Sequence, residues 1–203
     1  MMVCPACRHG NSVAAKFCEA CGAALGEGSN ERRKVVTVLF CDVVGSTALG
    51  ESTDPEALRV LLARYFERMK GIVESHGGSV EKFIGDAVMA VFGVPAVHED
   101  DALRACRAAV EMRGEFAALR IEGRIGVSSG EVVTGTDERL ATGDALNVAA
   151  RLQEVTKTSG YPLVATAALV AAADGAAAEG WTSLGAIAVR GHGAVDACGT
   201  TPG

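Results

Sequence analysis

Residues 81–93, EKFIGDAVMAVFG, decide the fold. Two apolar runs flank the pair Gly85-Asp86, and a two-residue Gly-Asp loop is a favoured connection in a β-hairpin. We therefore predict two antiparallel strands here. The hairpin also places Lys82 and Asp86 four residues apart in apolar surroundings, which raises the question of whether they serve one site.

Upstream and downstream of this hairpin, strand patterns alternate with helical ones. Residues 34–43, KVVTVLFCDV, form a short run rich in β-branched residues, which indicates a buried strand. Helical spacing of apolar residues begins at Pro55, with Asp54 as the capping residue, and His76-Gly77-Gly78 ends it. A second helix is expected at about 99–119, with four residues inward: Leu103, Cys106, Val110 and Phe116.

The second half of the chain continues this alternation. Residues 123–135, GRIGVSSGEVVTG, predict two strands around a turn, and a third helix starts near Gly143. A strand, a short Ala-rich helix and two strands follow, and 199–203 are expected to be a frayed tail. Hairpins mixed with crossover helices predict an α+β domain with one mostly antiparallel sheet and helices packed on it.

Composition limits the possible function classes. The chain has 203 residues, of which 49% are hydrophobic, and a net charge of −6, as in ordinary soluble globular proteins. No apolar run is long enough to span a bilayer and the N-terminus does not resemble a signal peptide, so we expect a cytoplasmic protein without a membrane partner. The net negative charge gives no general attraction to nucleic acid, so a polyanion must be held by a few placed cations or a metal.

Four of the seven cysteines form two Cys-x-x-Cys pairs, Cys4/Cys7 and Cys18/Cys21, with ten residues between the pairs. This spacing predicts a structural Zn²⁺ held by four thiolates, and two disulfides are the alternative that a reducing cytosol disfavours. Residues 1–22 are thus expected to form a zinc ribbon, and 23–33 a linker. The remaining cysteines are expected to be small buried hydrophobic residues: Cys41, Cys106 and Cys198.

Two aspartates are candidates for metal binding. Asp42 ends the strand 34–43, and the small residues that follow can turn backbone N–H groups toward an anion: Gly45, Ser46 and Thr47. Asp86 lies in the hairpin turn, and strand ends of one sheet can bring two such carboxylates together. Two carboxylates and phosphate oxygens are the usual ligands of Mg²⁺. An aspartate taken alone is more often an ordinary turn residue, whereas the two together with the surrounding residues favour metal binding.

Several basic and amide side chains suit a phosphate-bearing substrate. Asn147 and Arg151 are four apart and share one face of the third helix, where a guanidinium could stabilise charge on phosphorus or simply be solvated. Arg124 starts one strand and Arg190 ends another, and each is either a phosphate clamp or an ordinary edge cation.

Four blocks occur in order along the chain: VVTVLFCDVVGST, GGSVEKFIGDAVMAVFG, RIGVSSGEVVTG and TGDALNVAARLQ. Together they resemble the catalytic domain of class III nucleotide cyclases, the adenylate/guanylate cyclase family, over residues 34–198. A zinc ribbon before such a domain resembles a group of actinobacterial cyclases. The resemblance implies a ferredoxin-like α+β domain that acts as a homodimer, with metals from one chain and Lys, Asn and Arg from the other in each site.

The resemblance also implies a reaction. Asp42 and Asp86 would bind two divalent ions, Mg²⁺ or Mn²⁺, with help from the Val43 carbonyl. The ribose 3′-oxygen of ATP would attack the α-phosphorus and pyrophosphate would leave, giving 3′,5′-cyclic AMP, so the enzyme would be a phosphorus-oxygen lyase that produces a signalling molecule. Positioning and charge neutralisation dominate such phosphoryl chemistry.

Five residues match the nucleotide-binding positions of the family. The resemblance implies that Lys82 hydrogen-bonds adenine N1, where guanylate cyclases carry glutamate. It implies that Asn147 orients the ribose and that Arg151 stabilises the transition state. Arg124 and Arg190 match the basic positions that hold the β- and γ-phosphates.

Leu140 departs from the family pattern. Many members have Asp at this second adenine contact and a bacterial subgroup has Thr, whereas leucine cannot accept a hydrogen bond from the exocyclic amine. Losing such a bond costs on the order of 1 kcal/mol. Three alternatives therefore stay open: ATP selectivity through Lys82 alone, relaxed ATP/GTP specificity, or a catalytically weak or silent nucleotide-binding module. Asp137 and Asp144 lie close enough in sequence to substitute. The ribbon carries few cations, so a cap or a protein-docking role is expected rather than nucleic-acid binding.

Overall fold

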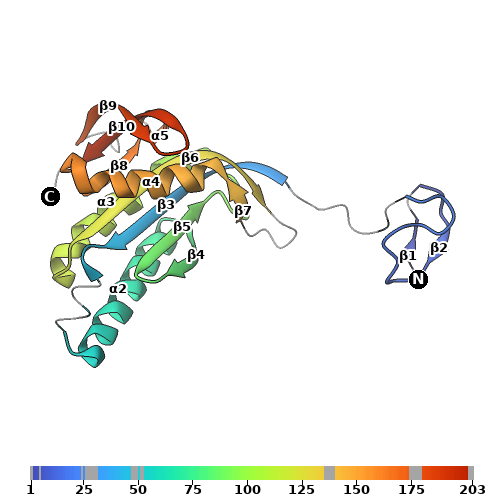
Figure 1. The fold of residues 1–203 in the computed structure, drawn as a ribbon, viewed down its shortest axis with the longest axis horizontal. Coiled ribbons are helices and arrows are strands. Elements are labelled where there is room, and N and C mark those ends of the chain that lie inside the picture. Colours follow the sequence, from blue (N-terminus) through green and yellow to red (C-terminus); the bar gives the residue numbers. More distant parts are fainter. Residues whose placement is uncertain are drawn as a thin grey trace.

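The chain folds around two separate sheets (Figure 1). The computed structural model describes residues 2–4, 6–23, 25, 32–46, 50, 53–134, 140–173 and 180–200. Near the N-terminus, β1 (Met2–Val3) pairs with β2 (Gly10–Asn11) in an antiparallel two-stranded sheet. The second sheet has eight strands in the order β4-β5-β3-β6-β8-β10-β9, and β7 pairs with β6 off this path.

The large sheet is almost entirely antiparallel. Its strands are β3 (Arg32–Val43), β4 (Ser79–Ile84), β5 (Ala87–Phe92), β6 (Gly123–Thr134), β7 (Leu140–Gly143), β8 (Leu163–Thr166), β9 (Trp181–Val189) and β10 (Gly193–Thr200). The pair β6/β8 is parallel, and the other strand pairs are antiparallel. The helices are α2 (Pro55–Ser75), α3 (Asp101–Leu119), α4 (Asp144–Ser159) and α5 (Ala167–Ala173). The predicted α+β class is confirmed.

Helix α2 begins and ends where the sequence predicts. The Asp54 carboxylate accepts hydrogen bonds from the backbone N–H groups of Glu56 and Ala57, and Pro55 occupies the first turn. The chain leaves the helix at Gly77, whose φ of +74° is left-handed and favours glycine. The predicted first helix is therefore confirmed at both ends.

The hairpin β4/β5 is also confirmed. Gly85 has a φ of +63°, so the tight turn depends on a glycine there. Strand β5 is buried from Val88 to Phe92, whereas β4 is the edge strand of the sheet and exposes Phe83 and Ile84.

The sheet is covered on two faces by different helices. Side chains of one face pack with α2, α3 and α5 in the largest core cluster, whose bulky members include Leu39, Tyr65, Phe92 and Met112. Alternate residues on the other face pack against α4, which Figure 1 shows lying across β3 and β6. A Cβ added at Gly126 would lie 2.2 Å from the Ala149 carbonyl oxygen, so glycine in β6 lets α4 lie directly on the sheet.

Three local predictions are wrong. Residues 123–135 do not form two strands around a turn, because β6 runs unbroken to Thr134 and pairs with β3 along its whole length. Val110 is not inward, since it is 38% exposed while Ala105, Ala108 and Ala109 face the core. Of the expected tail, Gly199 and Thr200 belong to β10, and 201–203 lie outside the described residues.

The cysteines outside the N-terminal pairs were predicted to be buried. This is confirmed for Cys41 and Cys106, which are fully buried, whereas Cys198 is half-buried.

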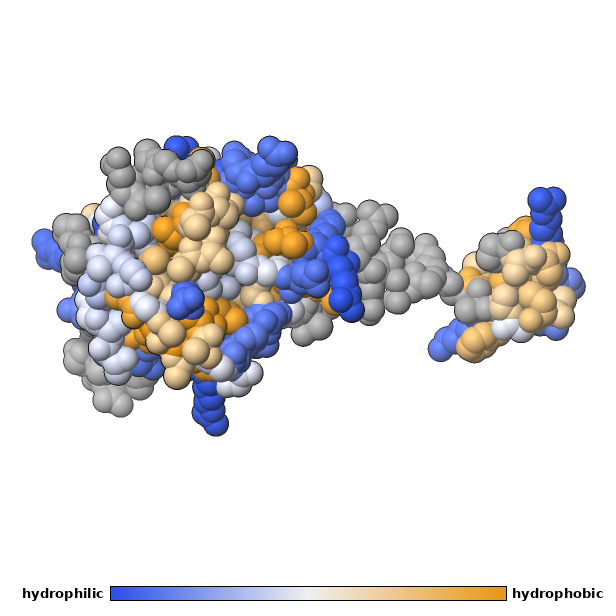
Figure 2. Space-filling view, turned by 90° about the horizontal axis from the view of Figure 1, so that it is seen from above, coloured by the Kyte–Doolittle hydropathy of each residue, from blue (hydrophilic) through white to orange (hydrophobic). Residues whose placement is uncertain are grey.

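The N-terminal segment exposes several apolar side chains. Val3, Val13 and Phe17 are exposed, and much of the surface of this segment in Figure 2 has apolar colours. Among the described residues, no helix is long and apolar enough to cross a membrane.

Candidate active site

The structure brings the two predicted metal aspartates together. Asp42 is the penultimate residue of β3, and Asp86 lies in the turn that leads into β5. Because β5 pairs with β3 at Cys41 and Val88, this turn lies beside the end of β3. Burial, followed by a hydrogen bond with Asp86 and by its negative charge, raises the pKa of Asp42 to about 6. The Asp86 carboxyl group therefore opposes ionisation of Asp42.

Arg124 completes this cluster from β6. It is the residue directly opposite Asp42 in the β3/β6 ladder. Its positive charge lowers the pKa of Asp42, although less than burial and Asp86 raise it. A basic residue beside two carboxylates is suited to an anionic substrate that arrives together with a cation.

Sequence reasoning missed one residue of this cluster. Gln153, on α4, is 9% exposed, and its Nε2 donates to Asp42 Oδ2 at 3.3 Å. The available signal was a polar residue on the inward face of an amphipathic helix, next to Leu152. The amide supplies a donor without adding charge.

The donor set fits a divalent cation. Two neighbouring carboxylates offer the hard oxygen ligands that Mg²⁺ and Mn²⁺ prefer, and a bound cation would offset the cost of ionising Asp42 beside Asp86. The N–H of Val43 helps to lower the pKa of Asp42, and the Val43 side chain is 3% exposed. The role expected for its carbonyl stays a prediction.

The turn after β3 lies next to this cluster. Val44 N–H donates to the Glu122 carbonyl at 2.8 Å, and Gly45 follows with a φ of +68°. Ser46 is half-buried, and Thr47 lies outside the described residues. The left-handed glycine gives the sharp change of direction that the predicted anion-binding turn requires.

Arg151 does not join the aspartates within one chain. Its Nη1 donates to both carboxylate oxygens of Glu154, at 3.0 and 2.9 Å. Since Arg151 and Gln153 are two residues apart, they project about 200° from each other around α4. Gln153 contacts Asp42, so Arg151 points to another side of the helix, and Asn147, one turn earlier, is exposed.

Arg190 lies near the N-terminal end of α4, whereas Gln153 lies nearer its C-terminal end. It is exposed in the turn between β9 and β10, and His192 in the same turn contacts Asp144, the first residue of α4. Gln153 lies nine residues further along the helix, or about 13 Å at 1.5 Å per residue. The turn that carries Arg190 is therefore nearer to the Asn147 end of α4 than to Asp42.

Lys82 and Leu140 are also separated from Asp42 in the sheet. Lys82 is exposed on edge strand β4, with β5 between it and β3. The Leu140 backbone pairs with Thr134, and its side chain is outside the described part of the structure. Asp137 also lies outside it, while Asp144 is engaged by His192.

Comparison with known proteins identifies the family. The adenylate and guanylate cyclase catalytic domain matches residues 29–197. The chain belongs to this family.

Curated relatives include an adenylate cyclase and uncharacterised mycobacterial proteins. Adenylate cyclase 1 of Rhizobium meliloti is 36% identical over 155 residues, which are 68% of this chain and 23% of that protein. An uncharacterised protein of Mycobacterium tuberculosis is 35% identical over 173 residues, 81% of this chain and 30% of that protein. The chain thus spans between about a quarter and a third of the length of these curated relatives.

Solved structures confirm the class III cyclase fold. The adenylyl cyclase CyaB from P. aeruginosa superposes with a TM-score of 0.73 at 28% identity, covering 85% of this chain and 96% of that one. The guanylyl cyclase Cya2 gives a TM-score of 0.70 at 27% identity, with 85% and 95% covered. Because both substrate classes match about equally well, the fold does not distinguish ATP from GTP.

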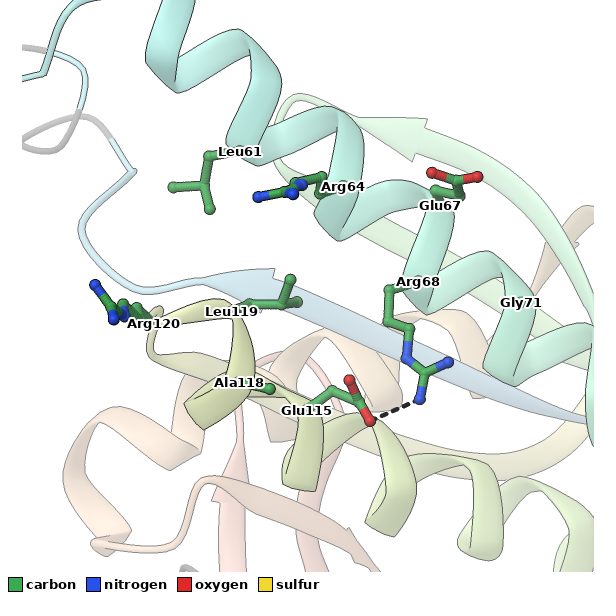
Figure 3. Close-up of a pocket in the computed structure, with 9 residues that line it drawn as sticks. All are labelled: Leu61, Arg64, Glu67, Arg68, Gly71, Glu115, Ala118, Leu119 and Arg120. Atoms are coloured by element: carbon green, nitrogen blue, oxygen red, sulfur yellow. Dashed lines mark hydrogen bonds and ion pairs between the residues drawn. The ribbon is translucent and has the colours of Figure 1, made fainter.

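Two hollows lie on the cyclase domain. A groove of about 900 Å³ between α2 and α3 is crossed by an ion pair of 2.7 Å between Arg68 and Glu115 (Figure 3). None of the predicted site residues whose side chains the structure describes lines this groove. A second cavity, of about 870 Å³, is lined by Val44, Gly123 and Arg124, so it adjoins the end of β3 that carries Asp42.

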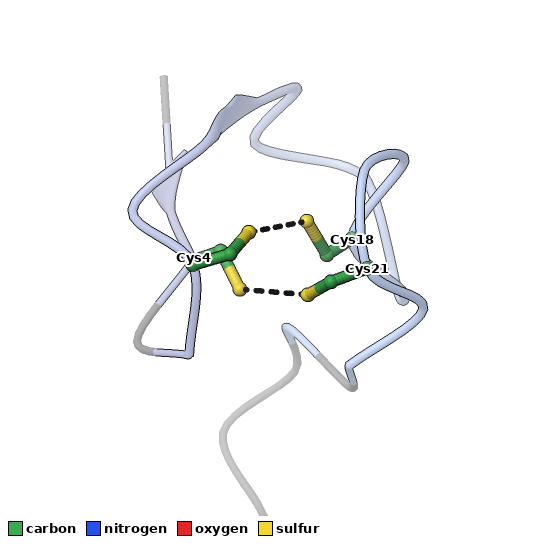
Figure 4. A group of neighbouring side chains, drawn as sticks. Cys4, Cys18 and Cys21 are labelled. Atoms are coloured by element: carbon green, nitrogen blue, oxygen red, sulfur yellow. Dashed lines mark hydrogen bonds between the residues drawn. The ribbon is translucent and has the colours of Figure 1, made fainter.

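The four cysteines that precede the cyclase domain form a cluster (Figure 4). Their sulfur atoms all lie within 4.8 Å of one another, with Cys4 to Cys21 at 3.6 Å and Cys7 to Cys18 at 3.5 Å. Tetrahedral zinc with Zn–S bonds of about 2.3 Å places sulfur atoms about 3.8 Å apart, so the donor set and its spacing fit Zn²⁺. Asn11 Nδ2 also donates to Cys18 Sγ at 3.7 Å.

Proposed function

We propose that this chain is an adenylate cyclase that converts ATP to 3′,5′-cyclic AMP and pyrophosphate with Mg²⁺ or Mn²⁺. The observation that carries the proposal is the meeting of Asp42 and Asp86 at the end of β3, with Arg124 opposite. Lys82, at the family's base-reading position, and a relative that is an adenylate cyclase favour ATP.

In the proposed mechanism, Asp42, Asp86 and the Val43 carbonyl would hold two divalent ions. When bound, these ions lower the pKa of the ribose 3′-hydroxyl and neutralise charge on the triphosphate. Arg124 and the turn at Gly45 bind phosphate oxygens. The 3′-hydroxyl loses its proton to solvent water, and its oxygen forms a bond to the α-phosphorus. The bond from that phosphorus to the bridging oxygen breaks, and pyrophosphate leaves with those electrons.

The site is proposed to be shared between two copies of the chain. One copy supplies Asp42, Asp86 and Arg124, and the other supplies four residues: Lys82, Asn147, Arg151 and Arg190. The separation of these two groups within one chain supports this division, since Arg151 points away from Gln153 and Lys82 lies on the edge strand. Exposed Phe83 and Ile84 beside Lys82 give that edge an apolar surface suited to a partner.

Arg151 would exchange its partner when substrate binds. Its ion pair with Glu154 is solvent-exposed, with side chains 38% and 50% exposed. An exposed pair of this kind contributes at most about 1 kcal/mol, so a triphosphate can displace Glu154 at little cost. The guanidinium then stabilises the negative charge that develops on the α-phosphate oxygens.

Leu140 favours a second candidate function. Without a hydrogen-bond acceptor for the adenine amine, the domain could bind ATP and GTP with relaxed specificity, or act as a weak or silent nucleotide-binding module. One assay separates these functions: purified protein with Mn²⁺ and either ATP or GTP, with products resolved by chromatography. Cyclic AMP that disappears in Asp86→Ala supports the proposal, and its absence from the wild type refutes it.

Complementation tests the shared site. Asp42→Ala and Arg151→Ala chains are each expected to be inactive alone. A mixed dimer regains activity, because one of its two sites keeps every group. An inactive mixed dimer, once shown by tagged co-purification to contain both chains, contradicts the division of residues.

The remaining assignments belong to the same proposal. We place a structural Zn²⁺ on Cys4, Cys7, Cys18 and Cys21 in a ribbon at 1–22. A linker that ends before β3 begins at Arg32 follows, and then a cyclase domain that runs from β3 to the end of β10 at Thr200. Exposed apolar residues on the ribbon suit a protein partner better than nucleic acid. The proposed setting is cytoplasmic, where ATP and Mg²⁺ are available.

A further inference from the structure

Gln153 makes a contact that the proposed mechanism does not use. We propose that it is a positioning residue that holds the Asp42 carboxylate in place for the divalent ion and fastens helix α4 to the metal site. This inference rests on the proposed metal-dependent function, and it concerns a residue on the inner face of α4.

The contact is directional and buried. Gln153 is 9% exposed, and its Nε2 lies 3.3 Å from Asp42 Oδ2. An ionised carboxylate only accepts hydrogen bonds, so the amide nitrogen must face it. A bond to one carboxylate oxygen fixes the rotation of the group and leaves the other oxygen to a cation, as partners of metal ligands commonly do.

The backbone is arranged so that Gln153 reaches Asp42. A Cβ at Gly126 would lie 2.4 Å from the Gln153 backbone nitrogen, so α4 touches β6 at this residue. Gly126 is two residues from Arg124, which stands opposite Asp42, so the helix lies directly beside the aspartate. The Thr156 hydroxyl donates to the Gln153 carbonyl at 2.6 Å and fixes the same helical turn.

Packing alone does not require an amide at this position. The neighbouring inward residues Ala149 and Leu152 are apolar and fully buried. A buried amide is costly unless it is hydrogen-bonded, and an apolar residue of the same length would fill the space. The amide is therefore placed for its bond to Asp42.

The bond between Gln153 and Asp42 joins a residue of one proposed active site to the helix that supplies Arg151 to the other site. Gln153 faces the Asp42 of its own chain, while Asn147 and Arg151 on the same helix are proposed to serve the other site. A cation that orders Asp42 consequently restrains the helix that presents Arg151. Metal binding at one active site would therefore help to fix the position of Arg151, which serves the second active site.

Manganese affinity tests the positioning role. Binding of Mn²⁺ alone is measured from the loss of the free-ion EPR signal, in wild type, Gln153→Met, Gln153→Ala and the control Leu152→Met. In Gln153→Met the side chain keeps its length but lacks the donor, whereas Leu152→Met disturbs apolar packing on the same helix, in the cluster with Val148 and Val164, and changes no polar group. We expect both Gln153 variants to bind Mn²⁺ about tenfold more weakly, and the control to stay within about twofold of wild type.

A second readout follows α4 directly. Mg²⁺ is expected to slow amide hydrogen exchange in residues 144–159 of the wild type, and to leave it unchanged in Gln153→Met. If Gln153 only packed, Gln153→Met would speed amide hydrogen exchange in α4 without metal, and Mg²⁺ would still slow that exchange. Wild-type Mn²⁺ affinity in Gln153→Met, or retained Mg²⁺ protection, overturns the inference.

Failure of the proposed function has a different signature. Wild type that binds Mn²⁺ in a Gln153-dependent way but forms no cyclic nucleotide refutes the cyclase proposal and supports the positioning role. Equal Mn²⁺ binding by wild type and Asp42→Asn would show that Asp42 does not bind the metal. That result overturns both the cyclase proposal and the positioning role of Gln153.

Discussion

Replacement of Asp42 by asparagine should stabilise the metal-free protein while it abolishes activity. In the folded chain the pKa of Asp42 rises from 3.8 to about 6, through burial and then through Asp86. A raised carboxyl pKa means that the stability gained from its protonation is fully present below about pH 4 and is lost as pH rises through 6. At pH 7 the ionised Asp42 therefore destabilises the fold.

The magnitude follows from the size of that shift. About two pKa units correspond to about 3 kcal/mol at most, at about 1.36 kcal/mol per unit. Asp42 is only half-buried, so solvent screening reduces the expected effect to about 1 kcal/mol. Asparagine has nearly the same shape, and its carbonyl can still accept the hydrogen bond from Gln153.

The assay is urea unfolding of wild type and Asp42→Asn at pH 7 and pH 4, in buffers freed of Mg²⁺ and Mn²⁺ by a resin. A soluble chelator is avoided because it would also remove the Zn²⁺ that we propose for the four-cysteine cluster. The variant should be about 1 kcal/mol more stable at pH 7 and equal at pH 4. Saturating Mg²⁺ should stabilise the wild type alone. A variant that is less stable than wild type at pH 7, or a difference independent of pH, refutes the reasoning.

Four further changes have defined outcomes. Arg104→Met should lower the free energy of unfolding by about 3 kcal/mol in urea titration, because it leaves the buried carboxylate of Asp101 without its ion pair. Gly126→Ala should cost about 1–3 kcal/mol by the same measurement and weaken Mn²⁺ binding, since its Cβ displaces α4; unchanged Mn²⁺ affinity would contradict this. Leu140→Thr should raise the ratio of kcat/KM for ATP over GTP about fivefold if the hydroxyl restores the missing acceptor, as measured by parallel assays. Zinc removal should release one Zn²⁺ per chain, counted with a colorimetric chelator, and abolish circular-dichroism and NMR signals of the ribbon while those of the cyclase domain persist.

Several features of the fold could be predicted because their causes lie within a few residues of each other. The capping of α2 by Asp54 and the glycine in the β4/β5 turn need only local backbone geometry. The segment around Ser129 was predicted wrongly for the converse reason. Two serines and a glycine favour a turn locally, but Thr37 Oγ1 and Ser129 Oγ lie 2.6 Å apart across β3 and β6, and Gly130 packs against the start of α4.

The candidate site also has features that the sequence predicted and features that only the tertiary structure revealed. The sequence by itself determined the family, the two aspartates and the cysteine spacing, because these are properties of residue type and order. The tertiary structure decided that Asp42 meets Asp86 and Arg124, that Arg151 faces elsewhere, and that Gln153 reaches Asp42 from 111 positions away. Such contacts depend on strand order and on how closely α4 lies on β6, and no stretch of neighbouring residues encodes either.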